Sequence, residues 1–322
     1  MRALVTGGTG FVGRHLVEAL LQRGDSVTVL VRTAAKATWL AERGVTIAAG
    51  SLSSPAALRD ACAGQEVLYH LAGLVAARDE AEFLSVNRDG TGRLLAAAES
   101  AGRPRIVYVS SLAAAGPAAR GTLRRGGEPS TPLTAYGRSK LAGEEIVRSS
   151  ALPWTIVRPP AVYGPHDTEM LTVFRAARFG LVPVFGDAAQ ELSLIYGPDL
   201  AHALVAAGTS DATAGGTFYA CHREVVTSGQ LVRTIAAAMG RSARVIPLPR
   251  WLADGAMTIT AAAATITGKA TLLTRDKARE FFAEAWTCDP GPLEEATGWR
   301  AAHDVATGAR ATAEWYRSAG WL

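Results

Sequence analysis

Cysteine is scarce in this chain of 322 residues, which has only three, Cys62, Cys221 and Cys288. They lie far apart and belong to no Cys-x-x-Cys motif or cysteine–histidine cluster. We therefore expect neither a disulfide framework nor a bound metal. A reducing, cytoplasmic setting fits this pattern.

The sequence also lacks a leader segment and a long apolar run. Residues 1–5 lead directly into an expected strand and a glycine loop, so no signal peptide is predicted. No uncharged apolar run of about 18 residues is present, so no integral membrane helix is expected. The nearest approach is the Ala- and Thr-rich stretch 251–267, which Asp254 interrupts. This stretch leaves peripheral contact with a membrane open.

A strong excess of one charge is absent too. The 33 basic and 29 acidic residues give a formal net charge of +4, and 48% of the residues are apolar. These values are typical of a soluble globular protein. The densest basic segment, 120–125, holds three arginines and no aromatic residue. We interpret it as a solvated loop and expect no nucleic-acid partner.

A glycine-rich turn between two apolar strands is the first informative pattern. Residues 2–6 and 27–31 are expected to be buried strands with a helix between them. The glycines at the start of that helix would let a backbone approach a pyrophosphate, and the helix N terminus offers unpaired N–H groups. The pattern predicts dinucleotide binding rather than a tight turn without a ligand. The expected contacts are Gly7, Thr9, Gly10, Phe11, Val12 and Gly13.

No acidic residue follows the second strand, where one would hold the ribose hydroxyls of NAD. Arg32 stands there instead, with Lys36 close by. A guanidinium suits a 2′-phosphate and offers no acceptor to a 2′-hydroxyl, so the predicted cofactor is NADP(H). If Arg32 only covers the adenine face, NAD(H) stays open. Further cofactor contacts are expected after the next two strands, at Ser51, Leu52, Leu71, Ala72 and Gly73.

Tyr136 and Lys140 are four residues apart on an expected helix, so their side chains share one face. An ammonium stabilises a phenolate, which predicts a Tyr136 pKa lowered towards neutrality. Such a phenol can exchange a proton with a carbonyl or alcohol oxygen. Asn87 lies within another expected helix, 82–101. Its amide is either exposed or faces the sheet and supports a proton relay behind the lysine.

Strands and helices alternate through at least six strands up to residue 158 and become less regular after Pro165. This alternation predicts an α/β fold with a doubly wound parallel sheet of the Rossmann type. We expect a dinucleotide-binding domain over 1–165, to which later strands near 192–208 return. A smaller interleaved substrate lobe is expected mainly over 166–322.

Taken together, the motifs resemble those of extended short-chain dehydrogenases/reductases, the superfamily of NAD-dependent epimerases and dehydratases. The resemblance covers nearly the whole chain. It rests on the glycine loop, the segment 70–73, Asn87, Ser110-Ser111, Tyr136-x-x-x-Lys140 and the segment 158–165. It implies that Tyr136 is the general acid/base, that Lys140 holds the nicotinamide ribose, and that Asn87 completes a tetrad. Ser111 is favoured over Ser110 as the hydroxyl that polarises the substrate oxygen.

The resemblance also places residues around both ligands. Pro159, Ala161 and Val162 are expected beside the cofactor, and His70, with its apolar neighbours, is expected to be structural. Helices near 82–101 and 134–150 build a homodimer interface in the family. Five residues either line an apolar substrate pocket or belong to the core: Leu74, Tyr163, Met170, Phe174 and Phe185.

Departures from family patterns narrow the expected reaction. Leu112-Ala113 replace the Asp-Glu pair of dehydratases. Pro160-Ala161 and the segment 191–193 lack the Asn and Arg that grip a diphosphate in nucleotide-sugar enzymes. The residues after Tyr163 look more like those of 3β-hydroxysteroid dehydrogenases and dihydroflavonol reductases. We expect an NADP(H)-dependent oxidoreductase that interconverts a ketone or aldehyde and an alcohol on a mostly apolar small molecule. A nucleotide-sugar epimerase and a non-catalytic NADP-binding protein are the alternatives.

Overall fold

The computed structural model of the chain describes residues 1–33, 37–249, 251–252, 255 and 275–322. Its centre is a parallel sheet of seven strands in the order β11-β6-β5-β4-β1-β2-β3. The strands are β1 (Arg2–Thr6), β2 (Ser26–Val31), β3 (Thr46–Ala49), β4 (Val67–His70), β5 (Arg105–Val109), β6 (Trp154–Arg158) and β11 (Gly216–Tyr219). The strand order reverses between β1 and β4, which opens a crevice at the carboxyl ends of these strands. The predicted doubly wound sheet is thus confirmed.

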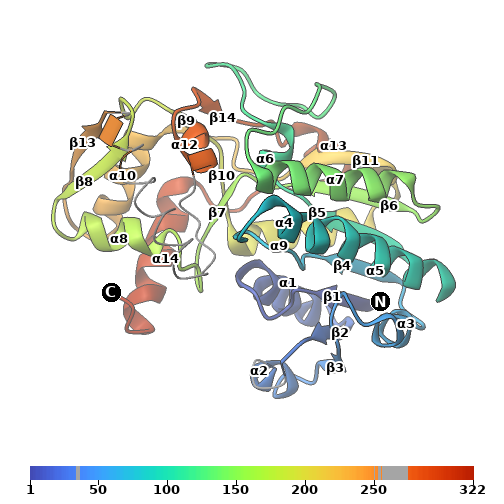
Figure 1. The fold of residues 1–322 in the computed structure, drawn as a ribbon. Coiled ribbons are helices and arrows are strands. Elements are labelled where there is room, and N and C mark those ends of the chain that lie inside the picture. The colour runs from blue at the N-terminus through green and yellow to red at the C-terminus, as the bar shows by residue number, and fades with distance from the viewer. Residues whose placement is uncertain (34–36, 250, 253–254, 256–274) are drawn as a thin grey trace.

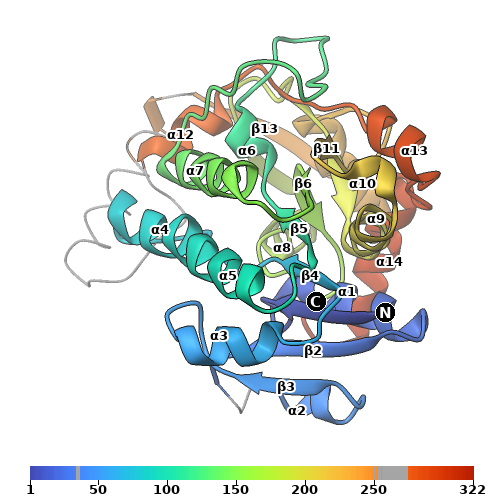
Figure 2. The same cartoon turned by 90° about the vertical axis from the view of Figure 1, so that its right-hand side faces the viewer.

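Helices cover both faces of the sheet because its strands are apolar on both sides. In β1, Ala3 and Val5 pack towards one face and Leu4 packs towards the other. The first face is covered by α1 (Phe11–Gln22) and α9 (Gly197–Thr209), and the second by α3 (Pro55–Cys62), α5 (Asp89–Ser100) and α7 (Ala135–Ser149). Figure 2 shows the two layers on either side of the strands. Short helices complete this part of the fold: α2 (Thr38–Ala41), α4 (Glu80–Asn87), α6 (Leu112–Ala115) and α13 (Gly291–Thr297).

A smaller lobe packs beside the sheet around its own apolar core (Figure 1). Its helices are α8 (Leu171–Ala177), α10 (Ser228–Ala238), α12 (Arg275–Phe281) and α14 (Val305–Ser318). Three small sheets accompany them: β7 (Ala161–Tyr163) with β10 (Leu194–Tyr196), β8 (Leu181–Phe185) with β13 (Arg244–Leu248), and β9 (Glu191–Leu192) between β12 (Val226–Thr227) and β14 (Ala285–Trp286). The lobe faces the carboxyl edge of the large sheet.

Some element boundaries differ from the sequence prediction. The helix expected over 82–101 is two helices, α4 and α5, which meet at Arg88. The later strands expected near 192–208 do not join the large sheet, because β9 and β10, which are separated at Ser193, belong to two different small sheets. The elements that return to the large sheet are α9 and β11. The division into two domains itself stays a prediction.

The stretch 251–267 lies mostly outside the described residues, so the helix expected there is not described. Within the described ranges, no helix has the length and apolarity that a bilayer span requires.

Candidate active site

The glycine loop joins β1 to α1 through a turn that admits no side chains at two of its positions. Gly7 has φ +77°, and a Cβ added to it would lie 2.8 Å from the backbone nitrogen of Ala72. A Cβ on Gly13 would lie 2.1 Å from the carbonyl oxygen of Gly7. The loop can therefore pack tightly against the end of β4 and the start of α1 only with glycine at these positions.

The N terminus of α1 fits the diphosphate of a dinucleotide. Its N-cap, Gly10, supplies no side-chain hydrogen bond to the first turn. Phe11 and Val12, which form that turn, line the large cavity described below. The first turn of α1 therefore lies at the cavity, and the unpaired N–H groups and positive dipole end of a helix N terminus suit an anionic group.

The residues expected to contact the adenosine end of the cofactor follow strands β2 and β3 at the same edge of the sheet. Arg32 directly follows β2, is exposed, and has no hydrogen bond or ion pair with the described residues. After β3, the Ser51 hydroxyl bonds those of Ser53 and Ser54, at 2.8 and 3.1 Å. The Leu52 carbonyl accepts a hydrogen bond from Arg93 Nε at 2.7 Å. Lys36 lies outside the described residues.

A cavity of about 840 Å³ fills the crevice between the sheet edge and the smaller lobe. Many predicted site residues line it: Phe11, Val12, Leu71, Gly73, Ser111, Tyr136, Lys140, Pro159, Ala161 and Val162. Others do not: Gly7, Thr9, Gly10, Gly13, Arg32, Ser51, Leu52, Ala72 and Asn87. The fold therefore brings the expected acid/base group and the α1 N terminus to one cavity, although they come from distant parts of the sequence.

The two serines after β5 point to different partners. The Ser110 hydroxyl donates to Glu144 Oε1 at 2.5 Å, within the buried interior. The Ser111 side chain lies near that of Tyr136, whose pKa it lowers, and accepts from the Ala113 N–H at 3.1 Å. Both serines line the cavity, but only Ser111 lies near Tyr136, so the choice of Ser111 stays a prediction.

The protein does not lower the Tyr136 pKa, contrary to the sequence prediction. Burial raises the pKa of Tyr136 to about 12. The nearby Ser111 hydroxyl opposes this rise, whereas the charges of Glu280 and Glu169 add to it. Tyr136 is therefore a protonated phenol at neutral pH, which suits a proton donor.

The Lys140 ammonium contacts Val109 and Tyr108 instead of the Tyr136 hydroxyl that the sequence predicted. Its Nζ donates to the Val109 carbonyl at 2.7 Å and lies 4.4 Å from the ring centroid of Tyr108. Burial lowers the Lys140 pKa to about 8, although the Glu144 charge opposes this shift. The ammonium lies beside the carboxyl end of β5, and its cavity-facing position fits the predicted role of holding a ribose.

Asn87 is buried at the end of α4 and is not a surface amide. Its Oδ1 accepts from the Leu74 N–H at 2.7 Å, and its Nδ2 donates to the Leu74 carbonyl at 3.0 Å and to Ser139 Oγ at 2.9 Å. The side chain thus ties the loop after β4 to α7. The predicted proton relay behind Lys140 is not tested by these contacts and stays a prediction.

His70 is structural, as the sequence predicted. It is fully buried, with Nδ1 2.7 Å from Thr6 Oγ1 and Nε2 3.0 Å from Thr91 Oγ1. Burial lowers its pKa to about 3, so the ring is neutral. Thr91 Oγ1 also donates to the Asn87 carbonyl at 2.7 Å. These bonds connect the end of β1 to the α4–α5 junction.

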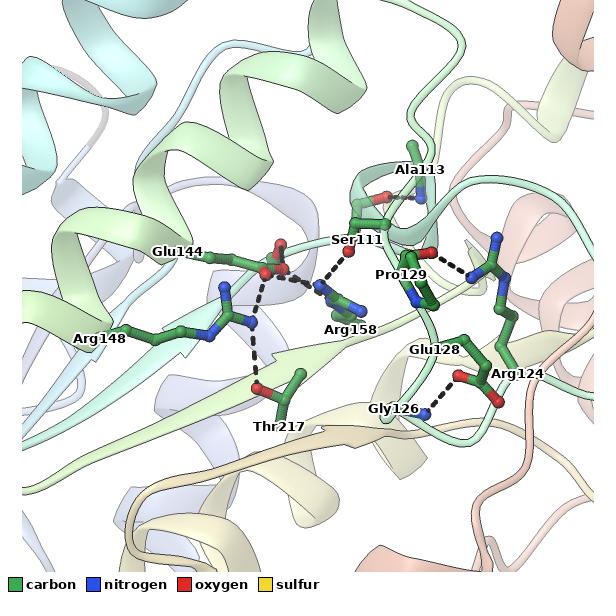
Figure 3. A network of polar contacts seen from close by, with 12 residues as sticks. Ser111, Ala113, Arg124, Gly126, Glu128, Pro129, Glu144, Arg148, Arg158 and Thr217 are labelled. Atoms are coloured by element: carbon green, nitrogen blue, oxygen red, sulfur yellow. Dashed lines mark hydrogen bonds and ion pairs between the residues drawn. The ribbon is translucent and has the colours of Figure 1, made fainter.

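A buried ion pair behind the cavity was missed by sequence reasoning. Arg158 donates to both carboxylate oxygens of Glu144, at 2.7 and 2.8 Å, and both side chains are buried. Arg148 donates to the same carboxylate at 2.8 Å, and Ser130 accepts from Arg158 at 3.0 Å. Figure 3 shows this network. One sequence feature could have indicated that Glu144 is buried. It lies four residues after Lys140, on the same face of the same helix.

The smaller lobe contributes residues that no local motif could reveal. Glu280 of α12 accepts from the Thr134 hydroxyl at 2.8 Å, and Thr134 in turn caps α7 by accepting from the Gly137 N–H at 3.1 Å. Gln190 Nε2 donates to carbonyls at the end of α12, including that of Glu280 at 2.8 Å. The lobe thus contacts the N terminus of the helix that carries Tyr136.

The apolar residues expected at the substrate pocket are divided between pocket and core. Leu74 and Met170 line the cavity, whereas Tyr163, Phe174 and Phe185 do not. Phe174 packs edge-on against Tyr316, with ring centroids 5.1 Å apart. Phe185 packs against Phe281, which does line the cavity.

The charged groups around the cavity are mostly acidic. Its described lining includes the carboxylates Asp79, Glu80, Asp167, Glu169 and Glu280, but only Arg78 and Lys140 as cations. Arg78 pairs with Glu82 at 3.1 Å. Burial raises the Asp167 pKa to about 6. The cavity therefore offers little compensation to an anionic substrate.

Comparison with known proteins identifies the family of the chain. Residues 3–221 match the NAD dependent epimerase/dehydratase family model. The chain is 37% identical over 319 residues to a ceramide reductase of Caulobacter vibrioides (strain NA1000 / CB15N), covering 99% of this chain and 95% of that protein. It is 35% identical over 189 residues, 56% of this chain and 57% of the other, to 4-hydroxy-2-methyl-3-oxo-4-farnesyl-3,4-dihydroquinoline-1-oxide ketoreductase of Stigmatella aurantiaca.

Among solved structures, the Thermus thermophilus UDP-glucose 4-epimerase in complex with NAD is similar to this chain with a TM-score of 0.79. The two are 25% identical, and the match covers 99% of this chain and 100% of the other. These matches extend through both the sheet and the lobe. The chain therefore belongs to the NAD dependent epimerase/dehydratase family, as an NAD(P)-dependent enzyme of the extended short-chain dehydrogenase/reductase type.

Proposed function

We propose that the protein is an NADPH-dependent reductase that converts a ketone on a large, mostly apolar molecule into an alcohol. The observation that carries this proposal is that Ser111 and Tyr136 lie near each other at the wall of the cavity, with Tyr136 held protonated. In this reaction Ser111 and Tyr136 bind the carbonyl oxygen, and Tyr136 gives it a proton. A bound nicotinamide supplies the hydride.

The other predicted site residues position the cofactor in this proposal. The glycine loop and the α1 N terminus bind the diphosphate, and Lys140 holds the ribose. Asn87 fixes the loop after β4 through its bonds to Leu74. The expected homodimer and cytoplasmic location stay predictions, and sedimentation velocity of the purified chain tests the first.

A long-chain lipid ketone is the substrate class we favour. The ceramide reductase relative matches nearly the whole chain, and the ketoreductase relative carries a farnesyl group in the name of its substrate. The cavity lining includes Leu74, Met170, Leu231 and Phe281. Such a wall suits an alkyl chain, because apolar area removed from water stabilises the complex.

Nucleotide-sugar epimerisation is the second candidate, because a UDP-glucose 4-epimerase shares the fold over the whole chain. The acidic lining of the cavity counts against it. A sugar diphosphate would meet Glu169 and Glu280 with no free cation besides Lys140 among the described lining residues. Glu191 lies where the nucleotide-sugar enzymes carry their arginine, and its carboxylate accepts from the Gly121 N–H at 2.7 Å.

A substrate panel tests the proposal. Long-chain ketones, steroid ketones and UDP-sugars are each incubated with NADPH or NADH, and the nicotinamide absorbance is followed. We expect NADPH consumption equal to alcohol formed with a long-chain ketone. Interconversion of UDP-sugars without net cofactor consumption would instead support the epimerase.

Replacing Arg32 with glutamate tests the cofactor preference. We expect NADPH affinity to fall by roughly tenfold to a hundredfold, because a charge-assisted contact to the 2′-phosphate becomes a repulsion. NADH affinity should change far less. Fluorescence titration of both cofactors measures this, with Arg59→Glu on α3 as a control of equal charge change. Equal losses for NADPH and NADH would contradict the assignment.

Replacing Glu280 with glutamine tests what sets the Tyr136 pKa. The Glu280 charge raises that pKa, so glutamine should lower it while still accepting from Thr134. Alcohol oxidation needs the phenolate and rises with pH through this pKa. The rise should therefore move to lower pH.

The pH profile of kcat/KM for alcohol oxidation measures the shift. Glu169 also raises the Tyr136 pKa and stays in place, as do Ser111 and Lys140. Glu284→Gln, an exposed change just beyond α12, is the control. Identical profiles for Glu280→Gln and the unmodified enzyme would show that Glu280 has no electrostatic role at Tyr136.

A further inference from the structure

The outer face of the β8–β13 sheet exposes apolar side chains that the site does not use. In the register of these parallel strands, Leu181 lies beside Arg244, and Pro183 lies beside Ile246. Leu181 and Ile246 are 55% and 42% exposed, whereas Val182 and Val245 pack towards the core of the lobe. The alternation of the strands therefore turns one apolar row outward.

Further exposed apolar side chains lie close in sequence to the ends of these strands. Phe179, just before β8, is 84% exposed, and Trp251 and Leu252, just after β13, are 72% and 41% exposed. We define the apolar strip as Phe179, Leu181, Pro183, Ile246, Trp251 and Leu252. Figure 1 places β8 and β13 at the outer end of the lobe, away from α3 and β3 at the other end of the molecule. Large exposed apolar side chains gathered in one place are unusual unless something binds them.

The sequence segments that carry the apolar strip contain basic residues but no acidic ones. Exposed arginines border it at Arg178, Arg241 and Arg244, and none of the three has an ion-pair partner among the described residues. The sequence contains no Asp or Glu between 170 and 186 or between 225 and 253. The first carboxylate after β8, Asp187, accepts from the Ala189 N–H at 2.9 Å. The overall composition does not explain this local lack of acidic residues, since the formal net charge of the whole chain is only +4.

We propose that the apolar strip and its bordering arginines dock on the surface of an anionic lipid bilayer. Aromatic and aliphatic side chains can enter the headgroup region, while the guanidinium groups bind lipid phosphates. A second copy of the chain fits less well. A twofold contact would place the same arginines opposite one another, and like charges would repel.

Vesicle co-sedimentation of the full chain tests this docking. Vesicles of phosphatidylcholine alone are compared with an equal mixture of phosphatidylcholine and phosphatidylglycerol. We expect binding to the mixed vesicles, little binding to phosphatidylcholine, and release as the ionic strength rises from about 0.05 to about 0.5 M. Absence of binding to the mixed vesicles at low salt overturns the proposal.

Variants separate the apolar strip from general positive charge. Arg178→Glu and Arg244→Glu should each weaken binding roughly fivefold or more, and Phe179→Ser should weaken it without any change in charge. Arg59→Glu, at the opposite end of the molecule, is the matched control and should bind normally. An equal loss in Arg59→Glu overturns the proposal. The proposal is also overturned if Phe179→Ser changes the self-association of the chain in sedimentation velocity but leaves its binding to vesicles unchanged.

The readout is independent of the proposed reaction. A protein that binds mixed vesicles but reduces no lipid ketone keeps the docking surface and loses the proposed substrate. A protein that reduces a lipid ketone but binds no vesicles keeps the proposed substrate and loses the docking surface.

Discussion

Tyr136→Phe should lower ketone reduction by at least about a hundredfold and leave NADPH affinity unchanged. The variant removes only the hydroxyl that lies near Ser111 at the cavity wall. General acid catalysis by a positioned side chain contributes about 10²- to 10⁴-fold, which sets the expected loss. The phenylalanine ring keeps the packing against Phe83, whose centroid lies 6.0 Å from that of Tyr136.

Steady-state rates of NADPH oxidation and fluorescence titration of NADPH measure the two halves of this prediction. Tyr163→Phe is a suitable control, because it removes a buried phenol hydroxyl that contacts His222 outside the cavity. Substantial turnover by Tyr136→Phe would mean that another group donates the proton. A matching loss of NADPH binding would mean that the residue acts through the cofactor.

Local spacing explains why much of the site could be predicted from the sequence. The distance between Gly7 and Gly13, and between Tyr136 and Lys140, is set within one turn or one helix. A helix fixes the relative positions of residues a few places apart whatever surrounds it. The structural role of His70 could be predicted from its apolar strand neighbours. A buried polar ring needs hydrogen-bond partners, and Thr6 and Thr91 supply them.

The errors arose where distant segments determine the outcome. The predicted fall in the Tyr136 pKa considered only Lys140, whereas burial by the whole site and charges from Glu169 and Glu280 of the lobe raise it. A pKa depends on desolvation and on all nearby charges, so a helix spacing cannot give its sign. The seventh strand, β11, pairs with β6 across a long connection for which the sequence has no local signal.

Arg158→Met should lower the free energy of unfolding by about 3–5 kcal/mol, the usual cost of leaving a buried charge unpaired. Arg158 and Glu144 are 2% and 0% exposed, and the arginine supplies two of the hydrogen bonds to the carboxylate. Arg148 and Ser110 would remain, but neither replaces both bonds. Urea unfolding followed by circular dichroism measures the change.

Arg148→Met is the matched control, because it removes the other arginine from the same carboxylate. That side chain is 36% exposed, so its loss should cost only about 0–1 kcal/mol. Glu144→Gln combined with Arg158→Met should be more stable than Arg158→Met alone, since no buried charge is left unpaired. Equal costs for the two arginine variants would show that burial does not decide the strength of this pair. A large difference would instead mean that the buried Arg158, and not the half-exposed Arg148, supplies most of the stability gained from pairing the Glu144 carboxylate, which also accepts from Ser110.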